Sequence, residues 1–264
     1  MKKLSSIILF ALFTSSILFA QVAINQTDAG GFKQGKWIVK YPSGAIRYQG
    51  SFSDNKPVGE WRRFHENGNL KAIMIHSINS DRVAAELFDE EGIRYAKGIY
   101  VGTHKDSTWN YFNNRKLVGQ ESYLNGKKNG HSVTFFENGT TATDSNWTDG
   151  FLDGVSASFF PSGNKKNEIN YFQGKRNGLI VSYYESGQRE IQGQYLNDQP
   201  DGAWKFNGEG GELKYTLNYK SGVLLNPEVL DKITESEFKD LDRKKGKLKD
   251  PQNFIQNPEE IMQR

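Results

Sequence analysis

Glycine recurs at one fixed spacing through most of this chain, which restricts the fold to a stack of similar units. Two series run in parallel, nine residues apart, with steps of 24 residues. The first series is Gly44, Gly68, Gly92, Gly139, Gly163, Gly187 and Gly211, and the second is Gly35, Gly59, Gly130, Gly154, Gly178 and Gly202. One slip interrupts the first series, because Gly92 and Gly139 are 47 residues apart. Such self-similarity is typical of one supersecondary unit repeated along the chain.

Each unit is predicted to be a β-hairpin. The units start at Gly35, Gly59, Val83, Ser107, Gly130, Gly154, Gly178 and Gly202. Their first strands, such as 178–184, are rich in β-branched and aromatic residues. These residue types favour the pleated surface of a β-sheet. A turn such as Pro42-Ser-Gly44 follows, and a second turn such as Asn125-Gly126 closes the unit. We therefore expect an all-β fold over 35–222, an elongated antiparallel β-meander or ribbon of about eight 24-residue hairpin repeats.

An aromatic residue ends the second strand of most units. The series is Phe52, Tyr100, Tyr123, Trp147, Tyr171, Tyr195 and Tyr219. A second column, Trp37, Trp61, Trp109 and Trp204, lies near the start of the units. Most of these rings are expected to stack from unit to unit and to supply the burial of a conventional core. The tryptophan column is also our first candidate partner-binding surface.

The unit resembles the MORN repeat, in the variant found in bacterial proteins of the YwqK-type antitoxin group. The residues that carry the resemblance are Gly59-Glu-Trp61, Phe64, Asn67-Gly68, Leu70 and Lys71, and the pattern returns over 154–177 and 178–201. The resemblance covers about 35–222. It implies an elongated β-meander with roles in scaffolding or membrane association.

Unit three departs from the pattern. It has Val83 in place of the first glycine and Ala85 in place of tryptophan, and an apolar run from Ala72 to Ile75 precedes it. Simple decay of the repeat would explain these differences. The alternative is that 72–95 forms a kink or an apolar patch that a partner covers, with Ile73 and Ile75 as candidate contacts.

The composition changes after Gly222, and 223–264 is predicted to be a partly helical, charged tail. Asn226-Pro227-Glu228 is typical of a helix start, with Asn226 as the N-cap. Leu230, Ile233, Phe238 and Leu241 could form one apolar stripe. Three roles remain open for this segment: a cap on the last strand, a partner-docking tail, or a basic patch against anionic lipid. The candidate contacts are Phe238, Leu241, Arg243, Lys244 and Lys245.

Residues 1–20 are predicted to be a cleavable secretory signal, since Lys2 and Lys3 precede an apolar stretch from Ile7 to Phe19. An uncleaved anchor is the alternative. Residues 21–34 would then be a linker to the repeats. The chain contains no cysteine, which excludes disulfides, thiolate chemistry and lipid attachment to an N-terminal cysteine. The expected location is secreted or periplasmic, and not as a lipoprotein.

No chemical motif accompanies the repeats. The four histidines show no metal-ligand spacing, and phosphate loops, dinucleotide fingerprints and nucleophile elbows are absent. Residues 21–264 carry 32 basic and 31 acidic residues, a balance that argues against a general nucleic-acid binder. We predict a protein without catalytic, cofactor-binding or metal-binding residues that acts as an interaction scaffold for another envelope or secreted protein. The alternatives are glycan or cell-wall binding through surface aromatics, and peripheral membrane association through the basic tail.

Overall fold

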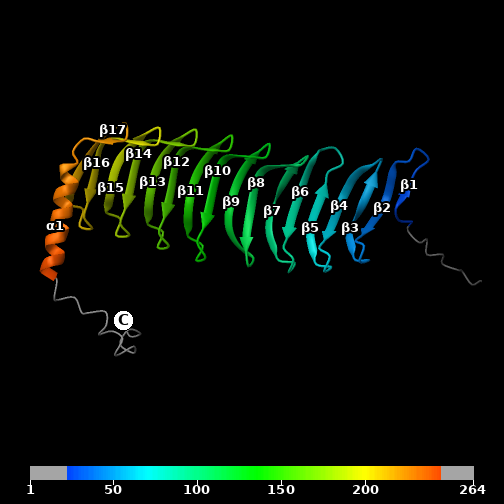
Figure 1. Ribbon diagram of the computed structural model, residues 1–264. Coiled ribbons are helices and arrows are strands. Elements are labelled where there is room, and N and C mark those ends of the chain that lie inside the picture. Colours follow the sequence, from blue (N-terminus) through cyan, green and yellow to red (C-terminus); the bar gives the residue numbers. More distant parts are fainter. Residues whose placement is uncertain (1–22, 245–264) are drawn as a thin grey trace, which may run out of the picture.

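The computed structural model describes residues 23–244, which form one open sheet of 18 strands and a single helix (Figure 1). The strands are β1 Gln26–Thr27, β2 Lys33–Lys40, β3 Ile46–Ser53, β4 Lys56–Phe64, β5 Leu70–His76, β6 Arg82–Phe88, β7 Arg94–Val101, β8 His104–Asn113, β9 Lys116–Leu124, β10 Lys127–Phe135, β11 Thr141–Thr148, β12 Phe151–Phe159, β13 Lys165–Phe172, β14 Lys175–Tyr183, β15 Arg189–Leu196, β16 Gln199–Asn207, β17 Leu213–Lys220 and β18 Val223–Leu224. The helix α1 spans Glu228–Lys244.

Each strand pairs in antiparallel fashion with its neighbours in sequence, from β1–β2 at one end to β17–β18 at the other. The predicted all-β meander with a C-terminal helix is therefore confirmed. The sequence indicated about 16 strands, and the two additional ones are the two-residue strands β1 and β18.

The turns follow the predicted chemistry. Asn125 and Gly126 both have positive φ, 49° and 81°, which is the geometry of a tight hairpin turn whose twist matches that of the strands. In the wider turns the amide of Gly44 donates to the carbonyl of Tyr41 at 2.9 Å, and Gly44 has a φ of 92°. The two kinds of turn alternate, so each long edge of the ribbon carries one kind.

A bulge near the start of the unit explains the second glycine series. Gly59 has a φ of 65°, and the pairing of β3 with β4 jumps from Ser51–Val58 to Gln49–Arg62. Three residues of β4, 59–61, therefore stand opposite Gly50. In unit three Val83 occupies the glycine position, and β5 pairs with β6 without any shift. A β-branched residue strongly disfavours positive φ, so the bulge is absent there.

The two faces of the sheet differ. Directly paired residues point to the same side, so Trp61, Met74, Ala85 and Gly98 share one face, which we call the aromatic face. It holds the cluster of Ala85, Ala96 and Trp109 with the partly buried Leu87, Tyr100, Tyr111 and Tyr123 packed against it. The opposite face, which we call the polar face, carries Arg62, Ile73, Glu86 and Lys97 in one row.

An asparagine side chain closes each open edge of the sheet. Asn25 Oδ1 accepts from the Ile38 amide at 2.8 Å, and Asn25 Nδ2 donates to the Ile38 carbonyl at 2.9 Å. At the far end Asn226 Oδ1 accepts from the Asn218 amide at 2.8 Å, and Nδ2 donates to the Thr216 carbonyl at 3.0 Å. The prediction that the Asn226 side chain caps α1 is wrong, because its amide is used by the exposed edge of β17.

Candidate functional site

The tryptophan column is part of the packing. Trp61, Trp109 and Trp204 are 6%, 0% and 8% exposed. Each indole lies over the glycine eleven residues earlier, and a Cβ built on Gly50, Gly98 or Gly193 would lie 2.2–2.3 Å from indole Cδ2. Each Nε1 donates to the carbonyl of the residue after that glycine, at 3.0 Å from Trp61 and Trp109 and 3.2 Å from Trp204. Glycine and tryptophan therefore form one packed pair.

This packing removes three of the four tryptophans from the candidate partner-binding residues. A ring that rests on a glycine and is buried by its neighbours has no free face for a sugar or a partner. Trp37 is partly buried, with Phe52 edge-on at 5.6 Å between centroids and Lys33 Nζ 4.8 Å from its ring centre. A signal in the sequence does mark the buried tryptophans: a glycine stands eleven residues before each of them. The repeat spacing alone does not reveal this signal.

A hollow lies on the aromatic face beside unit three. A concavity of 720 Å³ lies over β4–β7, and Ala72, Met74 and Leu87 lie along it. Ala85 stands where other units have tryptophan, and its partner eleven residues earlier is Met74 instead of glycine. Ala72, Met74 and Leu87 form the floor of the hollow, whereas Ala85 is buried in the cluster with Ala96 and Trp109. The hypothesis of an apolar patch within 72–95 thus has a structural counterpart.

The rim of the hollow is aromatic and carries both charges. Tyr95 is 45% exposed and borders the space together with Arg63, Lys71, Asp89 and Glu90. Other units place Arg47, Lys166 or Lys214 at the position of Tyr95. An apolar floor inside a rim of mixed charge suits an apolar side chain presented on a polar peptide.

The predicted contacts Ile73 and Ile75 lie outside this hollow. Ile73 pairs with Arg62 and Glu86, which places it on the polar face. Ile75, on the same face, is 52% exposed. The two isoleucines therefore lie on the same face as each other, and the hollow lies on the opposite face.

A half-buried ionic network lies beside the hollow, at the slip in the repeat. Lys105 Nζ donates to the Tyr111 hydroxyl at 2.8 Å. The Tyr111 hydroxyl in turn lies 3.1 Å from the Tyr123 hydroxyl. Tyr123 donates to Glu121 at 2.5 Å, and Lys128 pairs with the other oxygen of Glu121 at 2.5 Å. Burial raises the pKa of Tyr123 to about 12 and lowers the pKa of Lys105. This network ties β8, β9 and β10 together where the repeat loses one residue.

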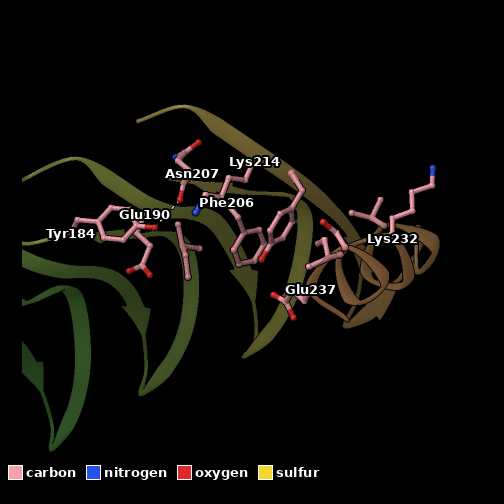
Figure 2. Close-up of a pocket in the computed structure, with 12 residues that line it drawn as sticks. Tyr184, Glu190, Phe206, Asn207, Lys214, Lys232 and Glu237 are labelled. Carbon is pink, nitrogen blue, oxygen red and sulfur yellow. Dashed lines mark hydrogen bonds between the residues drawn. The ribbon is translucent and has the colours of Figure 1, made fainter. Parts of the chain in front are cut away.

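The helix α1 lies beside the last strands of the ribbon (Figure 1). Val229 and Ile233 border a cavity of 610 Å³ together with Phe206 and Tyr215 of the aromatic face. Figure 2 shows Tyr184 and Phe206 on the sheet side of this space and Lys232 and Glu237 on the helix side. The helix therefore covers part of the face of the last unit, next to the edge that Asn226 closes.

The predicted apolar stripe of α1 is divided between two sides. Ile233 turns toward the sheet, whereas Leu230, Phe238 and Leu241 are 40%, 65% and 56% exposed. Arg243 and Lys244 both pair with Asp240. Lys245 lies outside the described residues, as does the predicted signal segment 1–20. The candidates Phe238 and Leu241 thus form an exposed apolar strip at the end of the ribbon.

The comparison with known families agrees with this architecture. The model of the MORN repeat variant matches residues 57–77 and 176–197, which include β4–β5 and β14–β15. The chain therefore carries MORN repeats of this variant at these two positions. None of the curated proteins matches it. MORN repeats are in general protein-interaction and membrane-interaction repeats and form a non-enzymatic family.

Two further observations concern residues 23–244 of this MORN-repeat protein. Its histidine and carboxylate side chains form no group of three or more that could hold a metal ion. None of its helical structure has the length and apolar character needed to cross a bilayer. The hollow over β4–β7 and the outer side of α1 are two candidate interaction sites.

Proposed function

We propose that the protein is an exported, non-catalytic scaffold of the cell envelope that binds another envelope or secreted protein. The observation that carries this proposal is the hollow over β4–β7, which lies beside the unit that departs from the repeat pattern. We infer that an apolar side chain of the partner enters the hollow and that Tyr95 closes over it.

The charges of the site favour a protein partner. The floor is apolar, and the rim opposes Arg63 and Lys71 to Asp89 and Glu90. A strongly charged ligand would meet both signs within the same rim. A peptide segment that offers one apolar side chain and several backbone dipoles meets complementary groups instead, as in the apolar centre and polar rim of protein interfaces.

Export is supported by the sequence of residues 1–20. A secretory signal consists of a positively charged start followed by a short apolar stretch, which is the pattern of these residues. On this proposal the mature chain works in the periplasm or outside the cell, and the part of the antitoxin resemblance that concerns a cytosolic toxin does not apply.

The outer strip of α1 would be a second contact for the same partner. Leu230, Phe238 and Leu241 are apolar and exposed. The helix carries six acidic and four basic residues, so its net charge is unfavourable for an anionic lipid surface. This balance favours docking of a protein over adsorption to a membrane.

The proposal is tested by affinity capture from a crosslinked cell envelope with tagged residues 21–264 as bait. The wild-type chain should retain one stoichiometric protein. Tyr95→Ala should lower its recovery at least fivefold, because truncating an aromatic anchor in an interface typically costs about 1–2 kcal/mol or more. Phe172→Ala is the matched control, since Phe172 is also exposed (54%) but lies far along the ribbon. Equal recovery with Tyr95→Ala and with Leu87→Glu, or retention by wall or lipid without any protein, would rule out the proposed site.

A further inference from the structure

A strip of small polar side chains runs across the aromatic face in the middle of the ribbon. Ser132, Ser145 and Ser156 form one row, since each pairs directly with the next. Thr134, Thr143 and Ser158 form the adjacent row on the same face. We call these six residues the hydroxyl strip, and its first row stands where other units place glycine or tryptophan. The second row continues through Asn167 and Ser182.

The members of the strip bond mainly to one another. The hydroxyls of Thr134 and Thr143 are 2.6 Å apart, and those of Ser145 and Ser156 are 2.9 Å apart. Asn167 Nδ2 donates to Ser158 at 3.1 Å. A hydroxyl can donate one hydrogen bond and accept two, so these pairs leave donors and acceptors over. Thr134 and Thr143 are exposed, which makes their remaining capacity accessible from outside.

Aromatic side chains border the strip on both sides. Trp147, Tyr171 and Tyr195 lie in the column that ends the second strands, and they pair with Gly130, Gly154 and Gly178 on the same face. Along the other edge Phe136, Phe160 and Tyr184 begin the wide turns. Tyr184 lines the cavity together with Ile191 and Phe206 of the aromatic face. Rows of hydroxyls between rows of rings are suited to sugars, whose ring faces are apolar and whose edges carry hydroxyl groups.

The strip itself is uncharged. Lysine, arginine, aspartate and glutamate are absent from its two rows, in contrast with the rim of the hollow over β4–β7. A phosphate or carboxylate ligand would find no counter-charge there. The complementary ligand is therefore a neutral polyhydroxyl chain.

We propose that the hydroxyl strip binds a neutral, extended glycan of β-1,4-linked pyranose units that lies along the ribbon, across the strands. Neighbouring strands are about 4.8 Å apart, so each two-strand unit advances the same set of groups by roughly 10 Å. A linear glycan is periodic in the same way, so successive sugar units would meet Thr134 and Thr143 on one pair of strands and Ser158 and Asn167 on the next. This binding site is distinct from the protein site proposed above.

The strip also has a simpler interpretation as a solvated surface. The buried polar atoms of the strip and its border distinguish the two interpretations, because water cannot pair with them easily. Ser132 Oγ and Trp147 Nε1 are buried and lack a hydrogen-bond partner within the described residues. Leaving buried polar groups unpaired costs free energy, and the equivalent pair Ile169 and Ile180 shows that an apolar solution fits the same backbone. A face that served packing alone would favour that apolar solution.

The test is titration calorimetry of residues 21–264 with two soluble probes, the β-1,4-linked tetramers of N-acetylglucosamine and of glucose. Wild type should bind at least one of them. The double variant Thr143→Val with Ser158→Ala should bind about tenfold more weakly, the loss expected for one to two hydrogen bonds. Thr108→Val is the matched control, because Thr108 is exposed and pairs with Ser122 on the polar face.

If the double variant has a lowered melting temperature, the single variant Thr143→Val, at an exposed position, replaces it in the titration. Tyr171→Ala tests the aromatic border independently. Absence of heat with both tetramers at millimolar concentration would overturn the proposal. So would unchanged affinity in a variant with a wild-type melting temperature, or an equal loss in Thr108→Val.

Discussion

Two stretches of the aromatic face use the same backbone differently. In β3–β4, β7–β8 and β15–β16 a glycine and a tryptophan eleven residues apart form a packed pair, and Trp109 is fully buried. In β11–β12 the same two positions hold Ser145 and Ser156, whose hydroxyls bond to each other. The feature that varies along the array is thus the pair, since a large ring on one strand requires an empty position on its neighbour. Units with the ring contribute more to stability, whereas on the proposal above the hydroxyl strip around the serine pair serves a ligand.

The largest effect should come from removing the ring itself. Trp109→Ala should destabilise the chain by about 3–5 kcal/mol, because Gly98 cannot fill the cavity that remains. Ser156→Ala, at the equivalent position of the other stretch, should cost about 1 kcal/mol or less. Urea denaturation monitored by circular dichroism measures both. Similar midpoints for the two variants would contradict the division of roles.

The next effect in size tests the glycine of the pair. A Cβ on Gly98 would lie 2.3 Å from Trp109 Cδ2, so Gly98→Ala should destabilise by about 1–3 kcal/mol through overpacking. Gly119→Ala is the matched control, since Gly119 also lies in a strand without positive φ and the nearest atom to its Cβ is at 3.4 Å. The double variant Gly98→Ile with Trp109→Ile copies the pair Ile169 and Ile180. Its loss in free energy of unfolding should be smaller than the sum of the losses of the two single variants.

The smallest effect sharpens the comparison in the ring column. His76 occupies a position where other units have an aromatic ring, and it lies edge-on to Trp61 at 6.2 Å. Burial, together with the charge of Arg63, lowers the pKa of His76. The unfolded chain therefore binds a proton near its ordinary pKa of about 6.5 more readily than the folded chain, and stability falls as the pH drops from about 7.5 to 5.

His76→Gln should make that fall shallower by a small amount, since the side chain is only partly buried. Melting temperatures at pH 5 and 7.5 measure it, with His104→Gln, at the exposed first residue of β8, as the control. A steeper loss of stability in His76→Gln would reverse the assigned sign.

The sequence was sufficient to predict the repeat, the hairpin and the meander, because glycine spacing and turn chemistry act locally. It was not sufficient to predict faces. Bulges such as the one at Gly59 change the alternation of side chains, and a shift of one residue exchanges the two faces of a strand. Ile73 and Ile75 lie on the face opposite the apolar hollow by the plain alternation of β5, which pairs with β6 without a shift. The burial of Trp61 depended on Gly50, a residue of the preceding strand.

The two asparagines at the sheet edges have a consequence for how such a chain changes in length. Asn25 and Asn226 finish the ribbon at its first and last long strands, and neither contacts the units between. Whole 24-residue modules can therefore be gained or lost in the interior while both terminators stay intact. The loss of a single residue has no such freedom, and the one such event, between Gly92 and Gly139, coincides with the network of Lys105, Glu121 and Lys128. The array is thus free to grow by duplication, whereas a single-residue deletion requires local repair.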